Sequence, residues 1–141
     1  IFILHPPLFL QTKLVTLLAF IVASLLAMML YFYFSFLISI TTFWIPEENG
    51  WPQRFVVFMI MEFFAGGLFP LDILPQPIYK IIKFLPTTYF INAPMQIYLG
   101  RATGANLGLT FGMMIFWLVA LGWFANWTFK KGLKVYGAYG R

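Results

Sequence analysis

The chain has 141 residues, of which 62% are hydrophobic, 21% aromatic and 9% charged, with a formal net charge of +5. A soluble domain carries about 25% charged residues, so the composition predicts a membrane protein. The lack of cysteine excludes disulfides, thiol catalysis and cysteine metal sites, and the single histidine, His5, excludes a histidine-rich metal site. The basic residues lie near the ends of apolar runs, which is typical of membrane anchoring and not of nucleic-acid binding.

Residues 1–12 open the chain with an apolar segment that Pro6 and Pro7 interrupt. Adjacent prolines disfavour a continuous helix, so we interpret this segment as the end of an earlier helix or as a turn at the membrane surface. The chain starts at Ile1, and its opening does not have the basic stretch, short apolar run and cleavage site of a secretory signal. We therefore expect the chain to be part of a longer protein.

Two long uncharged runs predict membrane-spanning helices at about residues 14–44 and 106–129. Each run exceeds the ~20 apolar residues that cross a hydrocarbon core of ~30 Å. The first run repeats alanine at every fourth position, at Ala19, Ala23 and Ala27. This stripe either lets a neighbouring helix approach closely or reflects only how common alanine is in helices.

A third, shorter apolar run at about residues 53–70 follows a loop that resembles a membrane interface. The loop contains tryptophans suited to the headgroup region, prolines that end and restart helices, and acids suited to water. The run is interrupted by Glu62, which makes it a marginal span. It leads into FAGGLFPLDILPQP, residues 64–77, whose glycines and prolines stop a helix and turn the chain back.

Residues 75–99 fit a full membrane crossing poorly, because they contain both lysines and prolines. Two short helices joined at LPTTYF, residues 85–90, and lying partly in the membrane fit these residues better. These residues favour an all-α membrane protein with three transmembrane helices and a helical hairpin that does not cross the membrane. A full crossing would give four spans, which the positive-inside rule mildly favours because three spans leave four basic residues outside. These residues are Lys13, Lys80, Lys83 and Arg101.

The last span begins with a GxxxGxxxG series formed by Gly104, Gly108 and Gly112. Such a series favours close packing of helices, although glycine is common in membrane helices in general. The chain ends in KKGLKVYGAYGR, residues 130–141, a basic tail that the positive-inside rule places in the cytoplasm.

The chain has four acids, Glu47, Glu48, Glu62 and Asp72. Glu62 is the main candidate, because an ionisable group within a span costs ~2.5–3.5 kcal/mol and usually faces a bundle interior or a water-filled path. The alternative is that Glu62 reaches water at the helix end or pairs with another helix. Asp72 is expected to cap the next helix or to lie in water. No G-x-S-x-G, H-E-x-x-H or P-loop sequence is present, so we assign no catalytic residue, metal or cofactor.

The order of these features resembles the C-terminal half of a type-2 ABC exporter permease. The resemblance covers residues 43–141 and rests on a series of short elements in a fixed order. They are the turn at residues 66–71, Pro75, the LPTTY element at residues 85–89, Gly100 and the Gly-Leu-x-x-Tyr tail at residues 132–136.

The resemblance implies a permease subunit with six spans, of which this chain would hold the last three. It also implies an outer-side re-entrant helical hairpin between the final two spans, and so favours an all-α membrane protein with three transmembrane helices and this hairpin over four spans. The resemblance further implies pairing with a second permease subunit as a homo- or heterodimer, and an ATP-binding cassette subunit that docks from the cytoplasm and drives export. We therefore expect an integral protein of a bacterial or archaeal plasma membrane, in contact with lipid. The residues expected to line the translocation path or its gate are Glu62, Gly66, Gly67, Phe69, Pro70, Asp72 and Pro75.

Two other functions fit the composition less well. The first is a membrane-embedded enzyme that uses Glu62 and Asp72, or His5, on a lipid-like substrate. The second is a structural membrane subunit. Added acids or histidines in upstream spans would favour the enzyme, whereas a neighbouring gene for an ATP-binding protein would favour the permease.

Overall fold

The computed structural model describes residues 13–44, 51–68 and 71–139, with the side chains of 51–53, 72 and 136–139 left out. Within these ranges the chain forms helices and no strand, which confirms the predicted all-α class. The helices, with 3₁₀ helices labelled η, are α1 (Leu14–Ile40), η1 (Thr41–Phe43), α2 (Trp51–Ala65), η2 (Leu71–Ile73), α3 (Gln76–Ile82), η3 (Pro86–Tyr89), α4 (Asn92–Tyr98) and α5 (Ala105–Tyr139).

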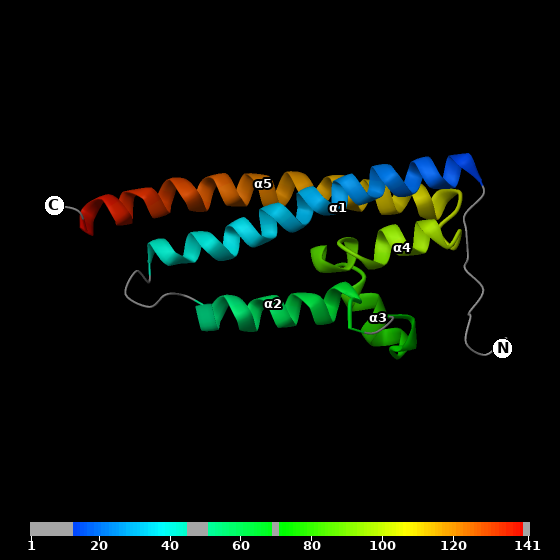
Figure 1. The fold of residues 1–141 in the computed structure, drawn as a ribbon, viewed down its shortest axis with the longest axis horizontal. Coiled ribbons are helices and arrows are strands. Elements are labelled where there is room, and N and C mark those ends of the chain that lie inside the picture. Colours follow the sequence, from blue (N-terminus) through cyan, green and yellow to red (C-terminus); the bar gives the residue numbers. More distant parts are fainter. Residues whose placement is uncertain (1–12, 45–50, 69–70, 140–141) are drawn as a thin grey trace, which may run out of the picture.

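The two longest helices, α1 and α5, lie side by side and run in the same direction (Figure 1). Helix α2 runs antiparallel to α1, while α4 packs on α1 and η3 packs on α2. The starts of α1 and α5 therefore lie at one end of the molecule together with α3 and α4, and we name this the hairpin end. The opposite end, where α1 and α5 finish, is named the tail end.

Two helices are long and apolar enough to cross a membrane. The segments are Leu14–Phe43, with 30 residues and a mean hydropathy of 2.5, and Ala105–Val135, with 31 residues and a mean hydropathy of 1.9. Only 17% and 11% of the residues in their most apolar windows are buried, so their side chains face outwards as lipid-exposed side chains do. Helix α2 has 15 residues. At ~1.5 Å per residue it is about 22 Å long, shorter than a hydrocarbon core of ~30 Å.

The core lies where α1, α2, α4 and α5 meet. Ala23 and Ala27 of the alanine stripe are buried there, at 0% and 5% exposure, so the small side chains are used for close packing. The ring of Phe90 makes edge contacts with the rings of Tyr31 and Phe34, at centroid distances of 5.8 and 5.7 Å. The other buried members of this core are Leu30, Met61, Ala65, Tyr89, Ala93, Ile97, Met114 and Leu121.

Two short helices, α3 and α4, occupy the segment that was expected to form a hairpin, and η3 joins them. A helix leaves its last carbonyl groups without partners inside the helix. At the end of α3 three consecutive carbonyl oxygens each accept a side-chain hydrogen bond. The donors are Thr88 Oγ1 to Ile82 (2.7 Å), the Tyr89 hydroxyl to Lys83 (2.9 Å) and Trp117 Nε1 to Phe84 (3.0 Å). The LPTTY element therefore has a structural role, because two of its side chains hold the end of α3.

Candidate functional site

A groove of about 600 Å³ runs between α1, α2 and α4 and contains Glu62. Among the described residues that line it, Glu62 is the only charged one. The rest of the lining is aromatic, aliphatic or sulfur-containing apart from one serine. It consists of Phe20, Ser24, Ala27, Met28, Tyr31, Ala65, Phe90, Ile91, Pro94, Met95 and Tyr98. The groove is thus an apolar surface with one acid, a combination suited to amphipathic molecules.

Glu62 is half-buried in this groove. Its carboxylate forms no ion pair or hydrogen bond with the residues that the structure describes. A buried or half-buried acid in an apolar surface is costly unless water, a ligand or another chain provides a partner. Among the described side chains of the groove, Glu62 is therefore the one expected to interact with water, a ligand or another chain.

The end of α2 places Glu62 next to the two glycines that the sequence singled out. Gly66 has φ +82°, a left-handed conformation that glycine adopts without strain. The Gly67 N–H donates to the Glu62 carbonyl oxygen at 3.2 Å, which is the helix-ending arrangement of the Schellman motif. A Cβ at Gly67 would lie 2.6 Å from Glu62 Oε2, so the absence of a side chain there leaves room for the carboxylate.

The other predicted path residues are not all gathered at this site. Phe69 and Pro70 lie outside the described residues, and so does the side chain of Asp72, whose backbone is in η2. Pro75 is exposed and precedes the first turn of α3. It lines neither the Glu62 groove nor the second cavity described below. The structure thus brings Glu62, Gly66 and Gly67 together at the end of α2.

The glycine series at the start of α5 is open. A Cβ built on Gly104, Gly108 or Gly112 would meet no other described atom within 4 Å. All three residues are exposed. The described part of the chain therefore provides no helix that packs on this face.

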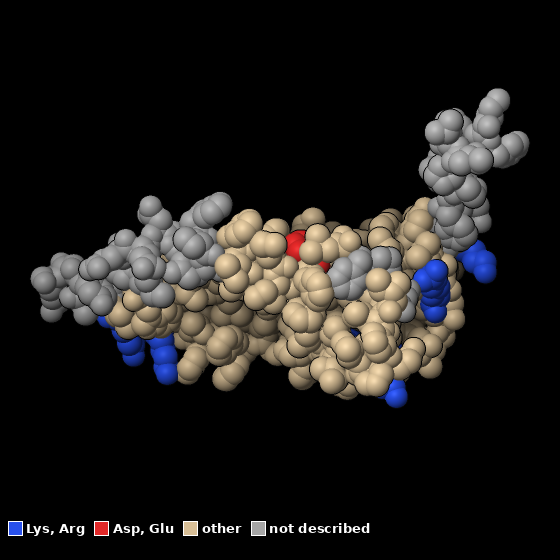
Figure 2. All heavy atoms as spheres, turned by 90° about the horizontal axis from the view of Figure 1, so that it is seen from below, with Lys and Arg blue, Asp and Glu red and all other residues tan. Residues whose placement is uncertain are grey.

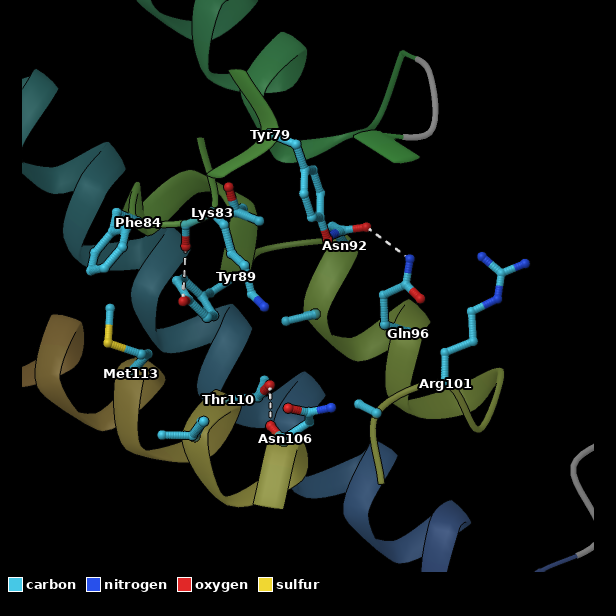
Figure 3. A pocket seen from close by; sticks show the side chains of 14 residues that line it. Tyr79, Lys83, Phe84, Tyr89, Asn92, Gln96, Arg101, Asn106, Thr110 and Met113 are labelled. Carbon is cyan, nitrogen blue, oxygen red and sulfur yellow. Dashed lines mark hydrogen bonds between the residues drawn. The ribbon is translucent and has the colours of Figure 1, made fainter. Parts of the chain in front are cut away.

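A second cavity, of about 410 Å³, lies between α3, α4 and the first turns of α5 at the hairpin end (Figure 3). Its polar lining combines Lys83 and Arg101 with Asn92, Gln96, Asn106 and Thr110. The sequence analysis did not predict this site, because we interpreted the charges and prolines of residues 78–99 only as evidence against a membrane span. One signal was available: Asn92 and Gln96, like Asn106 and Thr110, are four residues apart and so share a helix face.

The described residues contain no group of three or more His, Asp or Glu side chains that could hold a metal ion.

Among the described residues outside the long helices, Tyr89 is the titratable group whose pKa is clearly shifted. Burial, with a smaller contribution from Tyr79, raises the pKa of the Tyr89 phenol above 10.0. The phenol therefore stays protonated at neutral pH and donates to the Lys83 carbonyl.

Comparison with known proteins supplies the family. No curated protein and no solved structure is significantly similar to the chain. The family model described as ABC-2 family transporter protein matches residues 7–140, which is nearly the whole sequence. Members of this family are membrane components of transporters that typically work with an ATP-binding subunit. With its two long apolar helices the protein is an integral membrane protein, and the chain belongs to the ABC-2 transporter family.

Proposed function

We propose that the chain forms part of the permease subunit of an ATP-driven exporter. The observation that carries this proposal is the family match over residues 7–140. A partner subunit binds and hydrolyses ATP, and a second permease subunit, identical or different, completes the translocation path. The membrane is the plasma membrane of a bacterium or archaeon.

In the proposed topology, α1, α2 and α5 cross the membrane and the tail end lies in the cytoplasm. The basic side chains near the end of α5 support this orientation, since positive residues favour the cytoplasmic side. They are Lys130, Lys131 and Lys134. Helix α2 is the shortest of the three spans, and η2, α3, η3 and α4 form the re-entrant hairpin on the outer side. Backbone N–H and C=O groups outside regular helices are tolerated there because they form hydrogen bonds with protein groups or water.

In the proposed mechanism, ATP-driven closure of the partner subunits rocks the permease helices between inward-open and outward-open states. The break at Gly66 and Gly67 and the hairpin form part of the outer gate. The Glu62 groove faces the path, where its carboxylate meets water or substrate. The open face of Gly104, Gly108 and Gly112 packs against a helix of the assembled transporter.

The orientation of the hairpin is tested by labelling from one side of the membrane. The chain contains no cysteine, so Pro75→Cys, just before α3, and Lys80→Cys, within α3, introduce single reactive positions at exposed sites. Both should react with an impermeant thiol reagent from outside intact cells, and Lys131→Cys should react only after the cytoplasm is opened. Labelling of positions 75 and 80 only from the cytoplasmic side would contradict the topology.

The transport role is tested by purifying the tagged full-length permease from its native membrane. An ATP-binding cassette protein should co-purify in a fixed ratio, and the complex should hydrolyse ATP. A role of Glu62 in the path predicts that Glu62→Gln changes the ATPase rate or export, while Glu62→Asp keeps most of the activity because it keeps the charge. Recovery of a permease with no ATP-binding subunit would overturn the exporter assignment.

A further inference from the structure

The cavity at the hairpin end combines a cationic, polar rim with an apolar floor. The side chain of Lys83 reaches into it from the end of α3, and Asn106 and Thr110 face it from α5 (Figure 3). Arg101, from the loop between α4 and α5, lies at its edge. Its volume of about 410 Å³ falls within the ~300–1,000 Å³ of pockets that hold small molecules or parts of larger ones.

The charge of this cavity has one sign. The lining contains two cations, Lys83 and Arg101, and none of the described lining residues is an acid. Within the described part of the chain the Lys83 ammonium group has no ion-pair partner. A cation attracts an anion, and phosphate offers several strong acceptor oxygens to such a group.

Neutral hydrogen-bonding groups complete the rim. The side-chain amide of Asn106 makes no hydrogen bond with the described residues, so its N–H groups remain available for a ligand oxygen. The Thr110 hydroxyl donates to the Asn106 carbonyl oxygen at 2.9 Å, and its oxygen can still accept a hydrogen bond. A ligand with a phosphate and hydroxyl groups matches these donors and acceptors.

The lining becomes less polar along α5. Asn106 lies in the first turn of the helix, Leu109 and Thr110 follow one turn later, and Met113 lies one further turn along. The apolar segment of α5 begins at Ala105, so this face passes from the membrane surface towards the hydrocarbon within two turns. A molecule with an anionic head and an apolar chain would place each part against matching side chains.

The distribution of charge over the whole molecule supports the same ligand. Basic groups appear near both ends of the molecule, separated by a long stretch without them (Figure 2). In the proposed topology Lys83 and Arg101 lie at the outer surface, where the positive-inside rule disfavours them. A bound anion offsets this disfavoured charge, and this step of the argument rests on the proposed function.

From these observations we propose that the cavity binds an anionic phospholipid of the outer leaflet. The headgroup phosphate accepts from Lys83 and Asn106 inside the cavity, Arg101 adds positive charge at its edge, and the upper part of an acyl chain lies along Leu109 and Met113. A lipid bound there would connect α3 and α4 to the first turns of α5. It would thereby hold the hairpin against the last membrane-spanning helix.

The test uses the full-length permease in nanodiscs of zwitterionic phosphatidylcholine, titrated with phosphatidylglycerol and followed by native mass spectrometry. Lys83→Gln should weaken retention of phosphatidylglycerol about fivefold, as loss of one cation at an anionic surface predicts. Lys80→Gln is the matched control, because it removes the same charge from an exposed position on α3 that does not line the cavity. It should change retention less than twofold. Equal losses in both variants would reduce the effect to general surface charge and overturn the site.

A second variant separates hydrogen bonding from charge. Asn106 is exposed and makes no described hydrogen bond, so Asn106→Leu should fold normally and still weaken phosphatidylglycerol retention. Unchanged retention in both Asn106→Leu and Lys83→Gln would refute the proposal.

A competition experiment identifies the source of the phosphate. Inorganic phosphate and glycerol phosphate, which have no acyl chain, should not displace the lipid at millimolar concentration. Displacement by either would show that the site takes a free anion, and the lipid assignment would fail. Neither result affects co-purification of the ATP-binding subunit, so the site and the exporter assignment can fail separately.

Discussion

The indole Nε1–H of Trp117 on α5 donates a 3.0 Å hydrogen bond to the backbone carbonyl oxygen of Phe84, just beyond the end of α3. This bond joins residues 33 positions apart and ties the hairpin to the last long helix. Thr88 and Tyr89 hold the two preceding carbonyl groups. The position of α3 is thus fixed by three side chains on two different elements.

Loss of the Trp117 hydrogen bond should weaken the attachment of the hairpin. Trp117→Phe keeps an aromatic ring but leaves the Phe84 carbonyl without its side-chain donor, which should cost about 1 kcal/mol of stability. Thermal unfolding in detergent measures the loss. Trp123→Phe is the control, since Trp123 is 69% exposed on the same helix. Equal destabilisation by the two substitutions would show that ring size, and not the hydrogen bond, is responsible.

Tyr89 should give the stability of the protein a dependence on alkaline pH. Its folded pKa is raised by burial, so the folded state favours the protonated phenol. The stabilisation is fully present below the ordinary pKa of 10.0 and is lost as the pH rises through the folded value. Tyr89→Phe should reduce the loss of stability above pH 10, measured as the difference between the two unfolding curves. Parallel curves over this range would contradict the assignment.

The glycine at the end of α2 should tolerate no side chain without a loss of stability. Gly66 has φ +82°, where a Cβ costs ~1–2 kcal/mol. Its Cβ would also lie 3.2 Å from Leu71 Cγ. Gly66→Ala should therefore lower the unfolding midpoint of the isolated permease. Gly112→Ala is the opposite case, because this glycine lies within α5 and a Cβ added there would have no described atom within 4 Å. Alanine at this position should raise the free energy of unfolding by ~0.5–1 kcal/mol.

Local sequence signals predicted where a helix ends but not how the short helices that follow pack together. Gly66 and the prolines of residues 64–77 marked the end of α2 because their backbone preferences act within a few residues. The contact of Trp117 with Phe84 depends on how α5 packs on the hairpin, which no local pattern specifies. The cavity is likewise formed by Lys83 and Asn106 from different elements, and their convergence appears only in three dimensions.

The position at which α5 ends was also not predicted from the sequence. The sequence predicted a span that ends at about residue 129, and the helix continues through Tyr139. Apolarity marks the part of a helix suited to lipid, whereas the helix itself can continue as long as its residues favour it. Lys130, Lys131 and Lys134 are good helix formers, and the Lys131 ammonium lies 3.9 Å from the ring centre of Trp127.

The open glycine face of α5 should respond to side-chain size if it packs on another helix of the transporter. Gly108→Ala adds one small group and should preserve assembly, because small residues still allow close approach. Gly108→Leu should reduce the fraction of assembled permease in size-exclusion chromatography while the folded subunit keeps its helical content. Full assembly of the Gly108→Leu variant would assign this face to lipid.

Gly132 and Phe43 should be coupled at the tail end. The Phe43 ring packs directly on Gly132, and a Cβ there would overlap the ring. Phe43 also contacts the ring of Phe129, at a centroid distance of 5.8 Å. Gly132→Ala should destabilise the contact between η1 and α5 by ~1–3 kcal/mol, because added atoms in a packed site force neighbours to move.

A double-mutant cycle with Phe43→Leu tests this coupling, since the smaller side chain leaves room for the added methyl group. Gly132→Ala should be much less destabilising in the Phe43→Leu background than in the parent chain, with a coupling energy of ~0.5–3 kcal/mol measured by unfolding. Additive effects would mean that the ring moves aside at little cost. In that case the glycine of the Gly-Leu-x-x-Tyr tail would have a role other than making room for Phe43.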